Sequence, residues 1–269
     1  MKQNGDGKPQ GTYQVPAVDK ALDVLELLAS RPDGAAMTDL ANALGRSMGE
    51  IYRTVITLER RAFLYKHPVS ERYHLSLKLF ELAHRHPPMA RLLNMAQPLL
   101  EDLALATLQS CHLAVAERDE LLIVAAANSP LPMHYSVKVG AKFPLLETSS
   151  GVVITAFQSK ARMEATLAVI EKGEHAGLRR RFADALRLGH EAWESRVVTG
   201  VTNLTVPVSD HSGRVIAAIT VPYLEQTRAS QTRESTLLAL KETGRALSRG
   251  LGAQDTQTVT SEPRETIAS

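Results

Sequence analysis

The segment TDLANALGRSMGEIYRTVITLERRAF, residues 38–63, contains the strongest structural signals in the N-terminal part of this chain. Thr38 is a good N-cap for a short helix, and Gly45 can end that helix in the left-handed conformation. Ser47 and Glu50 have the spacing of a capping box, which predicts the start of a second helix. Two helices joined by a tight glycine turn indicate a helix-turn-helix.

The second of these helices has two different faces. Its apolar residues form one stripe, made of Ile51, Val55, Leu58 and Ala62. Its polar residues fall on the opposite side, which leaves them free to enter a DNA groove: Arg53, Thr54, Thr57 and Arg61. Two alternating segments follow, at residues 63–66 and 72–75, and they predict a β-hairpin, or wing.

The charge of the whole chain is nearly balanced, with 31 basic against 29 acidic residues and a net charge of +2. Nucleic-acid binding therefore requires a local concentration of basic residues. Such a bias exists in the second helix and the wing, carried by Arg46, Arg53, Arg60, Arg61, Lys66 and Arg72. It favours contact with a DNA groove and its phosphates, and the alternative is a helical hairpin with a solvated polar face.

The rest of the chain predicts a linker helix, residues 75–83, and an α+β domain. A stripe with steps of three and four residues is either a core face or a heptad-like interface: Met89, Leu92, Ala96, Leu99, Leu103 and Ala106. Strands are predicted at residues 111–117, 121–127, 133–139, 203–209 and 214–221. Helices are predicted at residues 150–158, 161–172, 178–188 and 230–251. Hairpin-linked strands with helices indicate a largely antiparallel sheet.

Composition excludes several classes of protein. The single cysteine, Cys111, excludes a disulfide framework and a multi-cysteine metal or iron–sulfur site. The longest apolar runs, residues 121–127 and 215–221, are far shorter than the ~20 residues that span a bilayer. The N-terminus has no apolar segment typical of a secretory signal. We therefore expect a cytoplasmic protein with no membrane contact, no metal and no cofactor.

Catalytic motifs are absent from the sequence. It contains no G-x-S-x-G, no G-K-[ST] loop and no H-E-x-x-H. Ser149 or Ser150 with His112 could act as nucleophile and base, but serines at the start of a helix are more typical of caps. His84 and His86 lack nearby cysteine or carboxylate partners, so we expect exposed histidines rather than metal ligands.

The order and spacing of these motifs resemble those of the IclR-type bacterial transcriptional regulators over about residues 16–250. Besides the helix-turn-helix and wing, the resemblance is carried by VPAVDKAL at residues 15–22, VGAKFP at 139–144, SSG at 149–151, GVTNL at 200–204 and AAITV at 217–221. It implies a winged helix-turn-helix, a linker helix and an effector-binding domain similar to the GAF fold. It also implies homodimers or homotetramers that respond to small organic acids or aromatic catabolites.

The expected chain organisation has five parts. The winged helix-turn-helix domain spans residues 15–76, the linker helix 77–88 and the effector-binding domain 89–251. Residues 1–14 and 252–269 are expected to be disordered tails because they contain few large apolar groups.

The candidate DNA-binding residues lie on the helix-turn-helix and the wing: Thr38, Arg46, Ser47, Glu50, Tyr52, Arg53 and Arg72. Arg53 matches an arginine that recurs in the recognition helix of the family. Glu50 stands where the family more often has threonine or serine, so its carboxylate either accepts from a cytosine amino group or only caps the helix. Arg72 on the wing is expected to contact a phosphate.

The candidate effector-binding residues are Ser149, Ser150, Trp193, Val201, Asn203 and Thr220. Adjacent small residues let an anion approach the free N–H groups of a helix N-terminus. Asn203 and Thr220 can reach the same cavity if their strands are neighbours, and Trp193 can close over an apolar group. Leu146 replaces a common histidine of the family and Trp193 a common acidic residue, which leaves the ligand's identity open.

The interpretation we favour is a regulator that binds double-stranded operator DNA under the control of a small organic or aromatic acid. Two alternatives remain: an enzyme with a pocket in the C-terminal domain, and a protein–protein adaptor that uses the winged domain. The sequence does not show whether the protein represses or activates, which operator it reads or which effector it binds.

Overall fold

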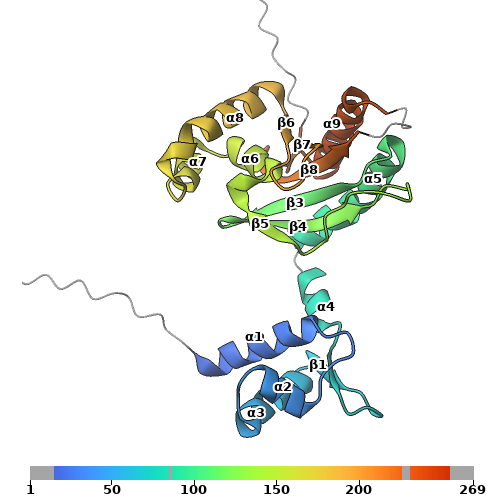
Figure 1. Cartoon of the computed structure of the whole chain (residues 1–269), viewed down its shortest axis with the longest axis vertical. Coiled ribbons are helices and arrows are strands. Elements are labelled where there is room, and N and C mark those ends of the chain that lie inside the picture. The colour runs from blue at the N-terminus through green and yellow to red at the C-terminus, as the bar shows by residue number, and fades with distance from the viewer. Residues whose placement is uncertain (1–14, 85–86, 226–230, 255–269) are drawn as a thin grey trace, which may run out of the picture. The chain divides into compact units, whose positions relative to one another are not determined.

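The computed structural model describes residues 15–84, 87–225 and 231–254 of the chain. These form two units, which divide between Pro87 and Pro88 (Figure 1). The expected tails, 1–14 and 252–269, lie outside the described residues except for 252–254. Within the described ranges, no helix has the length and apolar content needed to cross a membrane.

The N-terminal unit is a winged helix-turn-helix, which confirms the prediction. Its elements are α1 (Pro16–Ala29), α2 (Met37–Ala43), α3 (Met48–Arg60), the antiparallel wing strands β1 (Leu64–Lys66) and β2 (Tyr73–Leu75), and α4 (Lys78–His84). The helices and the wing bury a common apolar core that includes Val24, Leu40, Ile51 and Val55. Since these side chains occupy the inner face of each helix, the polar faces are left at the surface.

Two local predictions in this unit were wrong. The N-cap of α2 is Ala36 rather than Thr38, and the Asp39 carboxylate accepts a hydrogen bond from the Ala36 N–H at 3.2 Å. The chain is held extended at this point by a β-bridge between Ala35 and Tyr73, so the helix starts earlier than expected. Ala62 is exposed with φ 61°, beyond the end of α3, and so does not belong to the apolar stripe.

The C-terminal unit is built around a six-stranded antiparallel sheet of order β5-β4-β3-β8-β7-β6. Its strands are β3 (Cys111–Glu117), β4 (Glu120–Ala127), β5 (Lys142–Pro144), β6 (Glu191–Glu194), β7 (Val201–Ser209) and β8 (Val215–Leu224). Its α-helices are α5 (Pro87–Thr107), α6 (Ser149–Ala156), α7 (Lys160–Leu167), α8 (His175–Leu188) and α9 (Arg233–Gly250). Two short 3₁₀ helices, η1 (Leu145–Glu147) and η2 (Lys172–Glu174), precede α6 and α8. This confirms the predicted α+β class.

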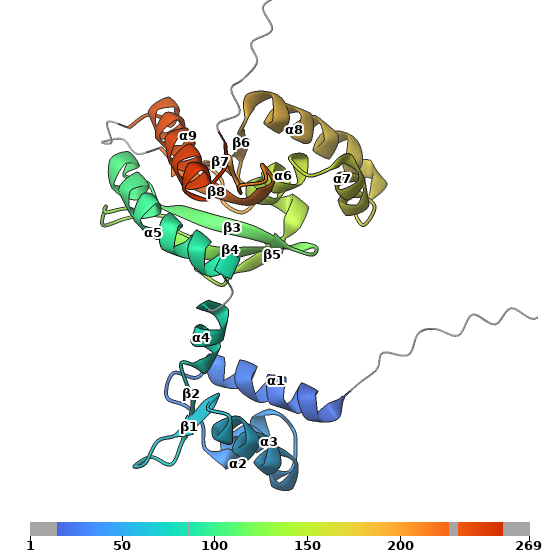
Figure 2. The same ribbon diagram turned by 180° about the vertical axis from the view of Figure 1, so that it is seen from behind.

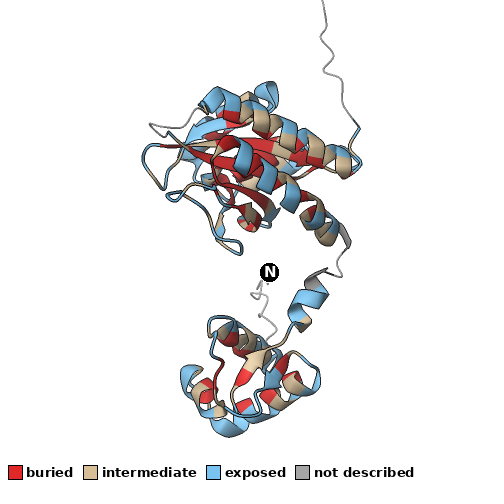
Figure 3. Ribbon diagram, turned by 90° about the vertical axis from the view of Figure 1, so that its right-hand side faces the viewer, coloured by how far each residue is buried: buried red, intermediate tan, exposed pale blue. Residues whose placement is uncertain are grey.

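Helices cover both faces of this sheet, and each face has its own core. Helices α5 and α9 pack on one face, where Figure 2 shows them in front of the strands. Helices α6, α7 and α8 pack on the other face. Figure 3 shows the buried residues running along the strands between these two layers.

The stripe that begins at Met89 belongs to the core of this unit. Leu92, Ala96 and Leu103 on α5 are buried against the sheet, whereas Ala106 is exposed. Pro98 lies inside α5 without ending it. Of the two interpretations of the stripe, the structure therefore supports the core face.

Two predicted segments differ from the structure, and one strand was missed. Residues 133–139 are not a strand, because Pro130 and Pro132 lead into an exposed loop and the next strand is β5. The strand β6, which contains Trp193, was not predicted, since its four residues become a strand only by pairing with β7. Helix α7 ends at Leu167 instead of residue 172.

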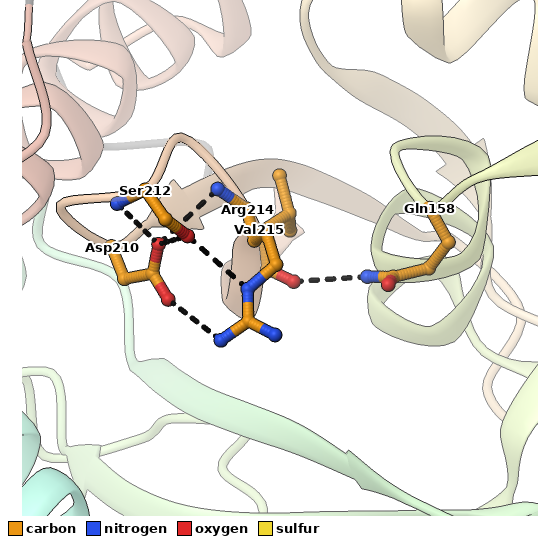
Figure 4. Close-up of polar contacts among 5 residues, drawn as sticks. All are labelled: Gln158, Asp210, Ser212, Arg214 and Val215. Carbon is orange, nitrogen blue, oxygen red and sulfur yellow. Dashed lines mark hydrogen bonds and ion pairs between the residues drawn. The ribbon is translucent and has the colours of Figure 1, made fainter.

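The turn between β7 and β8 is held by one carboxylate (Figure 4). Asp210 Oδ1 accepts from the Ser212 N–H at 2.8 Å and Oγ at 2.6 Å, and Oδ2 forms an ion pair with Arg214 at 3.3 Å. Burial by itself raises the pKa of Asp210, but the hydrogen bonds from Ser212 and Arg214 outweigh it and hold the pKa at about 2. Gln158, which follows α6, donates to the Val215 carbonyl at 2.9 Å and so links the start of β8 to the end of α6.

Candidate DNA-binding surface and effector cavity

The outer face of α3 carries the side chains best placed to enter a DNA groove. Ile51 and Val55 are fully buried, so the opposite side of the helix faces solvent. There Tyr52 is 55% exposed and Arg53 is also exposed. The capping box between Ser47 and Glu50 is confirmed, since the Ser47 side chain accepts from the Glu50 N–H and the Glu50 carboxylate accepts from the Ser47 N–H.

Two of the other candidate residues on α3 and its turn are already engaged within the domain. Arg46 forms an ion pair with Asp23 of α1 at 3.0 Å. The Glu50 carboxylate accepts from Ser47 and lies 3.6 Å from the Lys20 ammonium, and these contacts, those of Ser47 first, lower its pKa. Of the two roles predicted for Glu50, the structure therefore supports capping.

Arg72 links the wing to the loop before α2. Its guanidinium donates to the carbonyl groups of Asp33 at 3.0 Å and Gly34 at 3.1 Å, and it forms an ion pair with Asp39 at 3.4 Å. Its contact with a phosphate stays a prediction, and the structure adds a positioning role for the wing. Thr38 is exposed on α2, and its DNA contact likewise stays a prediction.

A cavity of about 70 Å³ lies at the N-terminus of α6 and contains four of the six candidate effector-binding residues: Ser149, Ser150, Asn203 and Thr220. The Ser150 and Thr220 hydroxyls are 2.7 Å apart, and Thr205 and Thr220 hydroxyls are 2.9 Å apart. Strands β7 and β8 are antiparallel neighbours, as the prediction required, and pair Thr205 with Thr220.

The start of α6 is formed by residues next to the two serines. Thr148 is the N-cap and accepts from the Gly151 N–H at 3.0 Å, so neither Ser149 nor Ser150 caps the helix. A Cβ at position 151 would overlap the Leu145 carbonyl, which explains the glycine there. This close approach of η1 to α6 buries both serines against the sheet.

His112 of β3 also lines this cavity, next to Thr220 in the sheet register. Burial lowers the pKa of its imidazole to about 4, so the ring is neutral near pH 7. The nucleophile–base arrangement considered above is not formed among the described residues, because Ser150 bonds to Thr220 and no serine bonds to His112. A neutral imidazole can instead donate to or accept from a ligand.

Two charged residues of the cavity were not predicted. Arg196 lies in the loop after β6, and Glu147 ends η1. Neither stands in a periodic or motif-like context in the sequence, and β6 itself was not predicted. Only the pairing of β6 with β7 brings Arg196 to the cavity that contains Asn203.

Trp193 and Val201 do not line this cavity. Trp193 is 44% exposed, and its ring lies against the Arg181 guanidinium, with 4.7 Å between the ring centroid and Cζ. Arg181 is held there by a bidentate ion pair with Glu191 at 2.8 and 2.9 Å. Val201 is buried at the start of β7. The predicted lid over the ligand is therefore not formed by Trp193, because this ring stacks on α8 instead.

Possible metal ligands do not gather in the described part of the chain, where no three histidine, cysteine, aspartate or glutamate residues lie together. The side chains of His84 and His86 lie outside the described residues.

Comparisons with known proteins agree with this two-domain architecture. The family described as "IclR helix-turn-helix domain" matches residues 17–68, and "Bacterial transcriptional regulator IclR C-terminal" matches residues 88–249. The glycerol operon regulatory proteins of Streptomyces coelicolor and Streptomyces griseus are 25% and 27% identical, and each alignment covers 89% of this chain and 97% of the relative. The regulator KdgR of Escherichia coli is 24% identical over 90% of this chain and 94% of its own.

Solved structures share the fold. The IclR protein of Thermotoga maritima superposes with a TM-score of 0.71 at 21% identity, covering 87% of this chain and 98% of that one. An IclR homologue from Microbacterium hydrocarbonoxydans, complexed with 4-hydroxybenzoate, has a TM-score of 0.73 at 23% identity and the same coverage.

A winged helix-turn-helix followed by an effector-binding domain defines a class of DNA-binding transcriptional regulators, and both domain families match here. The chain belongs to the IclR family of these regulators, which confirms the resemblance found in the sequence.

Proposed function

We propose that this regulator binds operator DNA through α3 and that a small carboxylic acid in the α6 cavity changes its affinity for that DNA. The observation that carries the proposal is the chemistry of the cavity. Buried hydroxyl groups and the helix N-terminus lie at one end, and Asn203, the cation Arg196 and one carboxylate, Glu147, also line it. Free N–H groups, hydroxyls and a guanidinium all favour a carboxylate.

The rest of the cavity wall is apolar and supports an acid with a ring or a hydrocarbon chain. Leu121, Ile123, Phe143 and Pro222 line it. An aromatic carboxylate would place its ring among these side chains and its charge at the α6 N-terminus. The cavity of about 70 Å³ has to widen to admit it, since small-molecule sites typically enclose about 300–1,000 Å³. The related protein from Microbacterium hydrocarbonoxydans was solved with 4-hydroxybenzoate, a ligand of this chemical class.

For the effector we predict that 4-hydroxybenzoate, as a reference aromatic acid, binds at least about tenfold more tightly than neutral 4-hydroxybenzamide. Ser150→Leu should abolish binding because the larger side chain fills the cavity and breaks the contact with Thr220. Asn203→Ala should weaken it. Isothermal titration calorimetry measures all three, with Ala183→Leu on the exposed face of α8 as the matched control.

Operator binding must be coupled to this site if the proposal holds. A ligand that changes operator affinity is itself bound with an affinity that the operator changes by the same factor. Unchanged acid affinity in folded Ser150→Leu and Asn203→Ala would place the ligand elsewhere. Equal affinities with and without DNA would contradict regulation through this cavity.

We also infer that the protein is at least a dimer, because a two-fold operator requires two recognition helices about 34 Å apart. The N-terminal unit exposes apolar side chains on two helices: Val18 and Leu22 on α1, and Leu79 and Leu82 on α4. Light scattering at micromolar concentration should give at least twice the 29.3 kDa chain mass. Leu22→Glu/Leu79→Glu should lower that mass, and a monomeric wild type would refute the inference.

A further inference from the structure

Helix α9 presents a row of basic side chains on one side. Lys241, Arg245 and Arg249 are four residues apart, so they lie on consecutive turns of the same face. With residues of β7 and of the β7–β8 turn they line a cleft of about 330 Å³, which we call the α9 cleft. Helix α9 covers the sheet face opposite α6 (Figure 2), and the α9 cleft shares no lining residue with the α6 cavity described above.

Two of the basic side chains of the α9 cleft, Lys241 and Arg245, form no ion pair within the part of the chain that the structure describes. No acidic side chain from the described ranges lines the cleft. Elsewhere in this unit basic residues do find partners, as in the pair of Lys142 with Glu120 at 2.9 Å.

Burial and, to a lesser extent, neighbouring positive charge lower the pKa values of two groups at the cleft. Burial and the neighbouring charge of Arg245 lower the pKa of Lys241. Burial, with a contribution from Lys241, also lowers the pKa of His190, which follows the lining residue Gly189. Like charges four residues apart destabilise a helix. A bound anion would remove this repulsion.

The floor of the cleft is rigid without a ligand. A Cβ at Gly244 would lie 2.8 Å from Val206 Cγ2, so the glycine lets α9 pack directly on β7. The Ser248 hydroxyl donates to the Gly244 carbonyl at 2.8 Å and accepts from the Ser209 N–H at 3.0 Å. A preformed site loses little conformational freedom when a ligand binds.

We propose that the α9 cleft binds a small metabolite with two or more phosphate groups, in addition to the acid proposed for the α6 cavity. The cations of Lys241 and Arg245, about 6 Å apart along the helix axis, match two phosphate groups, whereas one carboxylate would neutralise only one of them. A hollow of about 330 Å³ has the size of a small-molecule site and is too small to admit a DNA duplex.

Pyrophosphate is the probe, titrated calorimetrically into the full-length protein at constant ionic strength, with inorganic phosphate as the weaker comparison. Wild type should bind pyrophosphate saturably, and Lys241→Gln/Arg245→Gln should bind it at least about tenfold more weakly. The charge-matched control Lys160→Gln/Arg180→Gln, on α7 and α8, should bind like wild type. Lys241→Arg/Arg245→Lys keeps both charges and should restore most of the affinity.

Circular dichroism verifies that each variant is folded. The absence of saturable pyrophosphate binding by wild type would overturn the proposal, and so would equal losses in the cleft and control variants. A cleft variant that loses affinity for random-sequence duplex DNA, while wild type binds no pyrophosphate, would assign these residues to the DNA backbone instead. Retained binding in Ser150→Leu is expected, because that substitution lies in the other cavity.

Discussion

Replacing Arg53 with alanine is expected to reduce discrimination between operator and unrelated duplex by about 5- to 150-fold. An arginine that bonds to both acceptors of a guanine is worth about 1–3 kcal/mol of base discrimination. Arg53 is exposed on α3, and the structure gives its guanidinium no ion pair with any described residue. Arg46, by contrast, is already paired with Asp23, so Arg53 is the better placed of the two for reading a base.

The operator for this measurement is the duplex that wild-type protein selects from a random-sequence library. Fluorescence anisotropy at fixed salt then compares this duplex with a scrambled one. Arg53→Lys should retain affinity for the scrambled duplex but lose discrimination, since an ammonium lacks the planar fork of the guanidinium. Arg60→Ala, two turns further along α3, is the matched control. It should weaken binding to both duplexes by the same factor.

Substitution at position 53 is not expected to disturb the fold, because its side chain points away from the core residues Ile51 and Val55. A folded Arg53→Ala variant that discriminates like wild type would refute docking through this face of α3. If Arg53→Ala lost affinity for both duplexes by the same factor, Arg53 would contact only a phosphate and would not read a base.

Replacing Arg181 with methionine is expected to destabilise the C-terminal domain by about 3–5 kcal/mol. Removal of one partner from a buried ion pair leaves the other charge buried without compensation. Arg181 and Glu191 are each only 6% exposed at the side chain and are joined by two hydrogen bonds. The substitution also removes the cation from the Trp193 ring.

A neighbouring pair provides the control. Arg179 of the same helix pairs with Glu164, but their side chains are 47% and 40% exposed. Arg179→Met should therefore cost less than about 1 kcal/mol. The double variant Arg181→Met/Glu191→Leu should recover most of the stability, because an apolar pair carries no charge that burial must desolvate.

Urea denaturation followed by Trp193 fluorescence reports on the C-terminal domain, since this is the single tryptophan of the chain. Protein concentration must be equal in all samples, because association shifts apparent stability. If Arg181→Met and Arg179→Met lowered the free energy of unfolding by similar amounts, burial would not determine how much the Arg181–Glu191 ion pair contributes to stability. A double variant as unstable as Arg181→Met would show that packing, rather than the unpaired charge, dominates.

The features that depend on neighbours along the chain could be predicted from the sequence. The capping box of Ser47 and Glu50, the left-handed Gly45 and the apolar stripe of α3 act over one or two helical turns, and the structure contains all three. The hairpin turn at residues 210–213 is equally local. Such features are readable because each hydrogen bond or contact joins residues a few positions apart.

Which side chains share a site, in contrast, depends on contacts between segments that are far apart in the sequence. Ser150 bonds to Thr220, 70 residues away, and strand β6 exists only through its pairing with β7. That pairing brings Arg196 to the α6 cavity, and Trp193 lies against Arg181 instead of lining that cavity as the sequence predicted. Sheet register and helix packing join distant segments, so the spacing of residues along the chain carries no record of these contacts.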